Sequence, residues 1–369
     1  MRLNTIYFDE SLVFSGKGEE INNFLVEVFL NGEDEEALVD SYYDLDPIPF
    51  SKKIDSLRQI KINLLNDLEV ESALSPKSLA IANASINYGS YISKEKYPYK
   101  HHKKTKNSSL TKISDSFYEY RKKLNFDNKE LTYFTPYYDF MKRHFDNLAY
   151  TDCTTDCENG ERIIKNHLHF NRHKLKLIDS IVKEKELRDN LFRNVAMSYF
   201  LKVHDNIENN KIFLEDFHKL SSNNRHITEI HDLYEGVIKM QPNHSLPAIT
   251  VLDSMGTIVS LKAIAEKNKN AIFYFWTSDN PRHFASITKH AAKLSNLHPE
   301  ITFIGISLTP QLEKWQTMIQ ANNQSFSNQY KADNVDELRS ALIIDGLNKA
   351  ILTKDGVIVD AYKDMYSSF

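Results

Sequence analysis

Apolar and polar positions in the last third of the chain alternate in blocks that predict a layered α/β fold. Residues 271–276 and 301–306 are apolar runs with the length of buried strands. Between them Pro281 favours a helix start, and apolar residues then recur at three- and four-residue steps along one face: Phe284, Ile287, Ala291, Leu294 and Leu297. Two strands joined by a helix predict a parallel pair, because parallel neighbours need a crossover connection.

An antiparallel hairpin is predicted at the end of this region. Asp355-Gly356 separates the apolar runs 350–352 and 357–359, and Asp-Gly between two such runs is a strong hairpin signal. Ahead of the hairpin, Trp315 and Ile319 stand at helical spacing, and an apolar run follows at residues 342–344. Helices and strands in this order are typical of a layered α/β domain.

The preceding part of the chain is predicted to be all-helical. From Ile54 to Met240 it contains only three glycines, and large apolar residues recur at helical spacing. Gln241-Pro242-Asn243 is rich in turn formers and marks the predicted joint. We therefore predict an all-helical domain over residues 54–240 and an α/β domain over residues 241–369.

Residues 1–53 are predicted to form a strand and a helix. Gly16-Lys17-Gly18 lies between the two elements. A Gly-x-Gly after a strand also occurs in dinucleotide-binding folds, but the third glycine and a regular βαβ repeat are absent. We therefore interpret the two glycines as turn residues.

Charge and length exclude few classes of function. A formal charge of −4 over 369 residues gives no overall attraction to nucleic acid, and the length suits two or three domains. The basic run at residues 94–106 is interpreted as a solvated helix end or loop, and the acidic run at residues 33–46 faces solvent or the basic run. The first residues lead into polar sequence, so no secretory signal is expected, and no run reaches the ~20 apolar residues of a membrane span.

Cys153 and Cys157 are the only cysteines, and turn formers surround them. A closely spaced, even pair predicts a small structural disulfide in an oxidising compartment. Exposed cysteines of low pKa would instead indicate a redox pair. A zinc site is a further alternative, but the nearby histidines match no common spacing and suit a helix surface, so we predict neither metal nor cofactor: His167, His169 and His173.

Residues 246–369 resemble the TlpA-like and peroxiredoxin-like branch of thioredoxin-fold proteins. Leu246-Pro247 and the segment from Val251 to Leu261 look like the family's first hairpin, and residues 275–283 stand where the family has Phe-Trp-x-x-x-Cys-x-x-Cys. The resemblance implies a thioredoxin-like domain and a place in the bacterial periplasm or cell envelope. Multidomain members carry a signal sequence and a small β domain that have no counterpart here. The resemblance therefore implies a mature or shortened form, in which residues 1–53 are the remnant of a larger N-terminal region, or alternatively a cytoplasmic derivative.

The chain departs from this family at its catalytic positions. Asn280 and His283 replace the two cysteines, and Asn348 replaces a cis-proline, so a trans peptide is expected there. Because a thiolate is the nucleophile of thiol-disulfide exchange, these changes predict that the family's activity is lost. The residues expected to line the vestigial site are Trp276, Asp279, Asn280, Arg282, His283 and Asn348.

Two interpretations of this vestigial site stay open. Its residues are ordinary helix caps on the surface, or the helix N-terminus flanked by Arg282 and His283 binds a small anion or carboxylate; Trp276 also suits a core position. For the whole chain we expect a redox-inactive module that binds a peptide or protein, without a catalytic residue. The alternatives are an oxidoreductase using Cys153 and Cys157, and a helical domain that performs the function while the other domain supports it.

Overall fold

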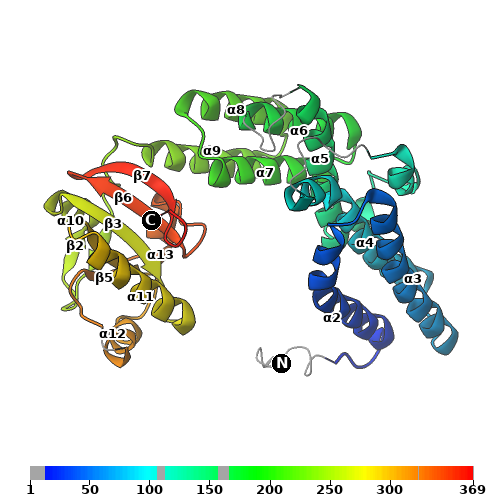
Figure 1. The fold of residues 1–369 in the computed structure, drawn as a ribbon, viewed down its shortest axis with the longest axis horizontal. Coiled ribbons are helices and arrows are strands. Elements are labelled where there is room, and N and C mark those ends of the chain that lie inside the picture. Colours follow the sequence, from blue (N-terminus) through cyan, green and yellow to red (C-terminus); the bar gives the residue numbers. More distant parts are fainter. Residues whose placement is uncertain (1–12, 106–112, 157–165, 323, 369) are drawn as a thin grey trace. The chain divides into compact units, whose positions relative to one another are not determined.

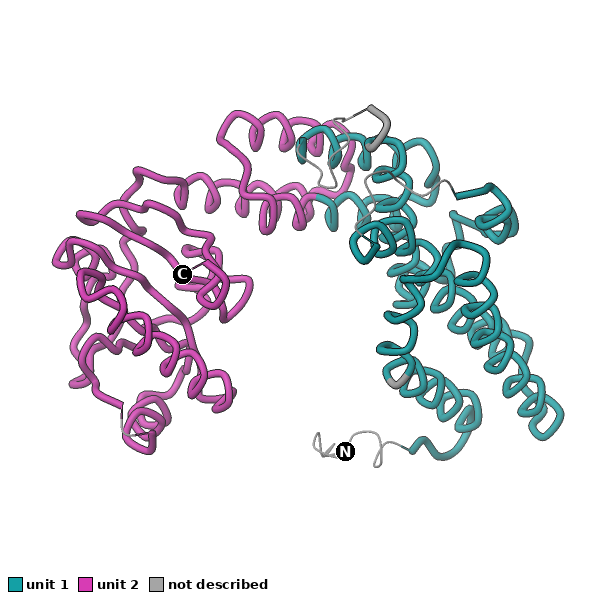
Figure 2. The backbone as a smooth tube through the Cα atoms, in the orientation of Figure 1, with its two compact units in different colours: residues 1–195 teal, residues 196–369 magenta. Residues whose placement is uncertain are grey.

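The computed structural model describes residues 13–105, 113–156, 166–322 and 324–368. Contacts divide the chain into two compact units, Met1–Val195 and Ala196–Phe369 (Figure 2). Each unit has its own hydrophobic core. The predicted domain boundaries at 53/54 and 240/241 stay predictions.

The described residues of the N-terminal unit form helices and no strand, as the spacing of apolar residues predicts. Figure 1 shows these helices in blue to green. Their bounds are α2 Glu19–Tyr42, α3 Pro47–Glu71, α4 Pro76–Thr105, η1 Asp115–Lys123, η2 Lys129–Leu131, α5 Thr135–Asp156, α6 His167–Ile181 and the first part of α7, Lys185–Lys202.

The two N-terminal glycines are turn residues, as predicted. Gly16 and Gly18 have φ angles of +93° and +84°, which residues with a Cβ rarely adopt, and α2 begins directly after them. The side chain of Glu19 accepts a hydrogen bond from the Gly16 amide at 2.6 Å. The strand expected just ahead of the turn involves residues that lie largely outside the described part of the chain.

The basic run is not the solvated helix end that its composition suggested. It forms the C-terminal half of α4, and its Lys94, Tyr97 and His101 side chains are buried. The Tyr97 hydroxyl donates to the Leu45 carbonyl at 2.7 Å, and the ring packs on Phe50 with centroids 4.4 Å apart. The interpretation was wrong because the aromatic residues between the lysines form a core face of the helix.

Part of the basic run does face the acidic run. The ammonium groups of Lys100 and Lys104 lie 3.4 Å and 3.0 Å from the Asp40 carboxylate on α2. All three side chains are partly exposed, so water screens these pairs and they contribute little to stability. The pairs orient α4 on α2 more than they stabilise either helix.

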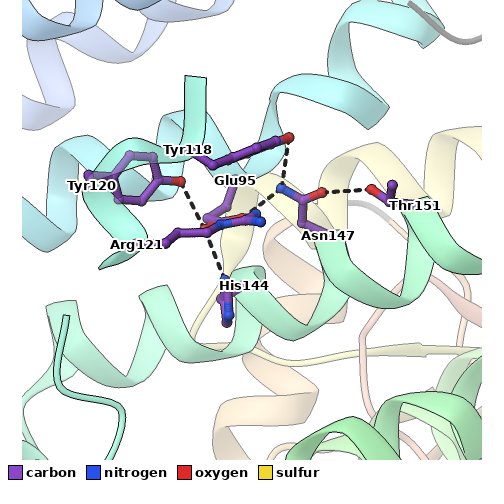
Figure 3. Close-up of polar contacts among 7 residues, drawn as sticks. All are labelled: Glu95, Tyr118, Tyr120, Arg121, His144, Asn147 and Thr151. Carbon is purple, nitrogen blue, oxygen red and sulfur yellow. Dashed lines mark hydrogen bonds and ion pairs between the residues drawn. The ribbon is translucent and has the colours of Figure 1, made fainter. Parts of the chain in front are cut away.

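A buried carboxylate connects three segments of the N-terminal unit (Figure 3). The Glu95 side chain on α4 has no solvent exposure. It accepts hydrogen bonds from the Tyr120 hydroxyl at 2.9 Å and from the Arg121 Nε at 2.9 Å, both on η1, and Arg121 also forms an ion pair with it. From α5, His144 Nδ1 lies 3.0 Å from one carboxylate oxygen and the Asn147 amide donates to the other at 2.6 Å. Both oxygens are therefore fully used.

Neighbouring groups hold these donors in place. Asn147 also donates to the Tyr118 hydroxyl at 3.2 Å, and its carbonyl oxygen accepts from Thr151 at 3.1 Å. The guanidinium of Arg121 lies 3.7 Å from the centre of the Tyr118 ring, within the range of a cation–π contact. The polar cluster around Glu95 is thus a satisfied network that fixes η1 on α4 and α5.

The pKa of Glu95 predicts how acid weakens the N-terminal unit. Burial alone would raise this pKa, but the hydrogen bond and charge of His144 and the charge of Arg121 outweigh it, lowering the pKa from 4.5 to about 2. Since the folded pKa is depressed, the carboxylate stabilises the fold fully above pH 4.5, and its contribution of about 3 kcal/mol disappears as the pH falls toward 2.

We therefore expect the difference in unfolding free energy between the wild type and Glu95→Gln to shrink between pH 5 and pH 2.5. Urea unfolding followed by circular dichroism at several pH values measures this difference, and the variant corrects for all other acids in the chain. A difference that stays constant over this range would show that the pKa of Glu95 is the same in the folded and the unfolded protein.

The C-terminal unit consists of a seven-stranded sheet with helices, preceded by α8 and α9 (Figure 1). The strand order is β2-β1-β5-β4-β3-β6-β7; β3, β4 and β5 are parallel, and the other neighbours are antiparallel. The bounds are α8 Ile207–Leu220, α9 Asn224–Lys239, β1 Thr250–Leu252, β2 Ile258–Ser260, α10 Leu261–Lys267, β3 Asn270–Trp276, α11 Pro281–Leu297, β4 Thr302–Ser307, α12 Leu312–Ala321, β5 Gln329–Ala332, α13 Val335–Ala341, β6 Lys349–Lys354 and β7 Val357–Asp364.

This arrangement is a thioredoxin-like fold and confirms the predicted fold class. The β3-α11-β4 crossover and both hairpins form where the sequence predicts them, and Asp355 and Gly356 in the last turn have φ angles of +50° and +83°. Two details differ. Strand β5 is too short and polar to produce an apolar run, and the apolar run 342–344 is not a strand but a buried turn after α13.

A buried amide joins the central strands of the sheet. The Trp276 indole donates to Gln329 Oε1 at 3.1 Å, and the Gln329 amide group donates to the Tyr274 hydroxyl at 2.7 Å. A Cβ added to Gly305 on β4 would lie only 2.3 Å from Gln329 Oε1. The absence of a side chain at Gly305 therefore makes room for the amide that bridges β3 and β5.

Gly305→Ala is expected to lower the unfolding free energy of the C-terminal unit by about 1–3 kcal/mol. The new methyl group displaces the Gln329 amide and leaves buried polar groups without their partners. Urea unfolding followed by tryptophan fluorescence measures the change. Gly346→Ala is the control, since no atom lies within 4 Å of its added Cβ; equal stability of the two variants would contradict the role of Gly305.

Candidate functional site

The vestigial site lies at the N-terminus of α11, directly after the central strand β3. Asn280 is the N-cap residue, and its side-chain oxygen accepts a hydrogen bond from the His283 amide at 3.0 Å. Pro281 occupies the first turn, where a proline costs no hydrogen bond. Asp279, Asn280 and Arg282 are exposed. The capping interpretation of Asn280 is thus confirmed, and one of the free amides of the helix end is already satisfied.

The structure brings His283 and Asn348 together, although 65 residues separate them. The distance between His283 Nε2 and Asn348 Oδ1 is 3.2 Å. His283 is half-buried, and its Nδ1 is buried without a hydrogen-bond partner among the described residues. Burial lowers the pKa of His283, and the hydrogen bond with Asn348 partly opposes this effect. The neutral imidazole is therefore favoured, with one ring nitrogen engaged by Asn348.

Asn348 belongs to a loop that leads into β6. The Lys349 amide donates to the Gly346 carbonyl at 3.3 Å, and the Asn348 carbonyl accepts from the Met365 amide at 2.7 Å. No peptide bond among the described residues is cis. The loop is therefore tied to the segment after β7, and it presents the Asn348 side chain toward α11.

Trp276 does not lie on the surface of this site. It has no solvent exposure, packs against Phe284 with ring centroids 4.3 Å apart, and belongs to the main core cluster of the C-terminal unit. The structure thus confirms the core position that the sequence also suggested for Trp276. A ligand on the surface therefore does not touch Trp276, which can affect binding only by positioning the residues around it.

The cysteine pair is described only in part. Cys153 lies in α5, and 3% of its surface is exposed, whereas Cys157 lies outside the described residues, so the disulfide stays a prediction. Of the nearby histidines, His173 Nε2 lies 3.0 Å from an Asp152 oxygen. Among the described residues, no three side chains of the His, Cys, Asp or Glu type gather closely enough to hold a metal ion.

The chemistry of the vestigial site is that of hydrogen bonding. Asn280 and Asn348 each supply an amide, His283 supplies an imidazole, and Arg282 adds a fixed positive charge at the rim. The cysteine positions of the resembled family hold no sulfur. In the described part of the chain, no helix combines the length and apolar character that a bilayer crossing requires.

Sequence patterns did not indicate two other groups of polar residues. Glu95 and its donors lie on three separate segments, and Lys349 is buried at the start of β6. A lysine or glutamate in an otherwise amphipathic segment normally points to solvent. The one available signal was the high density of tyrosines around Glu95, which indicates a core face of α4.

No family model matches this chain, and no curated protein matches it. Solved structures match parts of it. The thioredoxin domain of a thiol-disulfide oxidoreductase from Bacteroides vulgatus is 24% identical over 32% of this chain and 86% of that one, with a TM-score of 0.26. A thiol:disulfide interchange protein from Bacteroides sp. is 25% identical over 33% and 81%, with a TM-score of 0.27.

A thioredoxin-like protein from Bacteroides caccae matches a longer part of the chain. It is 13% identical over 66% of this chain and 86% of that one, with a TM-score of 0.39. At these TM-scores the likenesses carry no argument about function. The assignment of the C-terminal unit to a thioredoxin-like fold is supported by its own strand order and register.

Proposed function

We propose that the protein is a redox-inactive thioredoxin-fold module that binds an extended peptide or a protein segment at the vestigial site. The observation that carries this proposal is the contact between His283 and Asn348. Two positions that were assigned separately from sequence, one to a cysteine and one to the facing proline, are in contact in space. This contact supports a site that recognises an extended chain, at two positions whose side chains carry no thiol.

The groups around this contact suit an extended ligand. Asn280, Arg282 and Asn348 are exposed, and together they offer amide donors, amide acceptors and one positive charge. Recognition of an extended chain needs backbone hydrogen bonds and side-chain pockets but no thiol. The proposal includes a periplasmic or envelope location, which rests on the sequence resemblance alone.

Binding can be tested with a permanently unfolded chain that lacks free thiols, such as reduced and carboxymethylated α-lactalbumin. Amide shifts in NMR spectra are expected to be concentrated at residues 278–283 and 346–349. A His283→Ala, Asn348→Ala variant should bind severalfold more weakly, and Lys289→Ala, on an exposed part of the same helix, should bind like the wild type. Shifts spread over other elements would contradict the site.

Insulin reduction tests the alternative function, an oxidoreductase that uses Cys153 and Cys157. Insulin reduction by dithiothreitol is expected to proceed at the uncatalysed rate with the wild type and with the Cys153→Ser, Cys157→Ser variant. Cys153 is buried, and a buried sulfur is a poor nucleophile for an external disulfide. Activity in the wild type that disappears in the variant would establish the alternative.

A further inference from the structure

A pocket of about 360 Å³ lies within the C-terminal unit, beside the last two strands. This open pocket is lined by the end of α7, the turn that follows it, the loop before β6, and β7. Its lining includes the side chains of Leu201, His204, Lys349 and Tyr362. The volume is at the lower end of the range of small-molecule sites in proteins. The pocket shares only Asn348 with the vestigial site.

Lys349 is a buried cation inside this pocket. Only 7% of its surface is exposed, and its ammonium group donates to the Ile343 carbonyl at 2.7 Å. The same nitrogen lies 4.4 Å from the centre of the Tyr362 ring. Among the described residues, no carboxylate lies within ion-pair distance of it. An ammonium carries three donors, so a buried one with a single carbonyl acceptor retains unused capacity for an anion.

The other charges near Lys349 are already engaged or lie at the rim. Asp364 accepts from the amides of Tyr366 and Ser367, and Asp360 accepts from the Tyr362 amide and lies 3.5 Å from the Lys363 ammonium. Three further ionisable side chains are exposed: Lys202, His204 and Asp345. The rim carries two acidic side chains, Asp345 and Asp364, and two basic ones, Lys202 and Lys363, so it offers no net positive charge for a second anionic group of a ligand.

The rest of the pocket is suited to an apolar or aromatic group. The rings of His204 and Tyr362 are stacked with centroids 4.1 Å apart, and Leu201 lies beside them. The Tyr362 hydroxyl donates to the Val237 carbonyl of α9 at 3.4 Å, which positions the ring. Since the two rings cover each other's faces, the apolar part of a ligand would contact their edges and Leu201 while its charged end pairs with Lys349.

We propose that this pocket binds a small organic monocarboxylate, whose carboxylate pairs with the Lys349 ammonium and whose apolar body contacts Leu201, His204 and Tyr362. Benzoate is a suitable probe, and benzamide is its neutral counterpart of the same shape. Benzoate should bind measurably in a calorimetric or NMR titration, with shifts at residues 201–204, 345–349 and 362–364, and benzamide should not.

The pH dependence of benzoate binding gives a second readout. Burial lowers the pKa of Lys349 to about 8, and the charges of Asp345 and Asp360 partly oppose this effect. The free protein therefore loses the Lys349 proton above pH 8, and benzoate affinity should fall roughly thirtyfold between pH 6.5 and pH 9.5. Other ionisable side chains also face the pocket: Lys202, His204, Tyr362, Lys363 and Asp364. A Lys349→Met variant isolates the part of the pH dependence that comes from Lys349.

Lys349→Met should abolish benzoate binding and its pH dependence, and Lys349→Arg should retain binding because the charge is kept. Lys202→Met is the matched control, since Lys202 is exposed at the same pocket. The comparison of benzoate with benzamide needs only the wild type, so it decides the question even if a variant does not fold. Equal binding of both probes, binding of neither, or unchanged binding by Lys349→Met would overturn the proposal.

Discussion

Glu95→Ala is expected to lower the unfolding free energy of the N-terminal unit by about 3–5 kcal/mol, the range seen when one partner of a buried ion pair is removed. The change removes every hydrogen bond that the carboxylate accepts from η1 and α5. Arg121 and His144 then remain in the interior without their anion. The penalty arises from these stranded donors more than from the lost attraction itself.

The two units allow this effect to be localised. Both tryptophans, Trp276 and Trp315, belong to the C-terminal unit, whereas both units contribute helix to the circular dichroism signal. In urea, Glu95→Ala should move the dichroism transition of the N-terminal helices to lower concentration. The fluorescence transition should stay where it is in the wild type.

Glu119→Ala is the matched control for this experiment. Glu119 lies on the same segment η1, and its pair with Lys122 is exposed at both ends. Because water screens an exposed pair, its removal is expected to change the stability very little. If Glu95→Ala and Glu119→Ala unfold at the same urea concentration, the cluster around Glu95 does not stabilise the unit.

The fold could be predicted from sequence wherever one short segment carries its own signal. The apolar run of β3, the stripe of α11 and the Asp-Gly turn each specify a local structure without reference to the rest of the chain. Strand β5 could not be predicted, because it has four residues and acquires its place only by pairing with β4 and β1.

The candidate site could likewise be predicted only in part. The contact between His283 and Asn348 could be anticipated, because the resemblance assigns both positions within one known frame. The burial of Lys349 could not, since it depends on three segments that enclose the lysine in space. The prediction that the basic run is solvated was wrong for a related reason. The sequence gives the charge of Lys94 but not the residues that bury it in the folded chain.

Asn280→Cys, His283→Cys, made in a Cys153→Ser, Cys157→Ser background, is expected to catalyse insulin reduction by dithiothreitol, which the background variant should not do. The fold already provides the two positions at the N-terminus of α11, three residues apart. A thiol at a helix N-terminus has a lowered pKa, because the helix dipole and free amides stabilise the thiolate. The variant restores sulfur at both positions and leaves Asn348 where the family has its cis-proline.

A second cysteine pair tests whether the helix end is what matters. Lys289→Cys, Ala292→Cys has the same spacing in the middle of α11, at exposed positions, without free backbone amides. This pair should remain close to the uncatalysed rate. Equal rates for the two pairs would show that any exposed dithiol suffices, and no gain by the first pair would show that the loop carrying Asn348 has lost the geometry for exchange. A rate specific to positions 280 and 283 would instead mean that the chain lost its activity through side-chain replacement while its frame was kept, as expected if that frame still serves recognition.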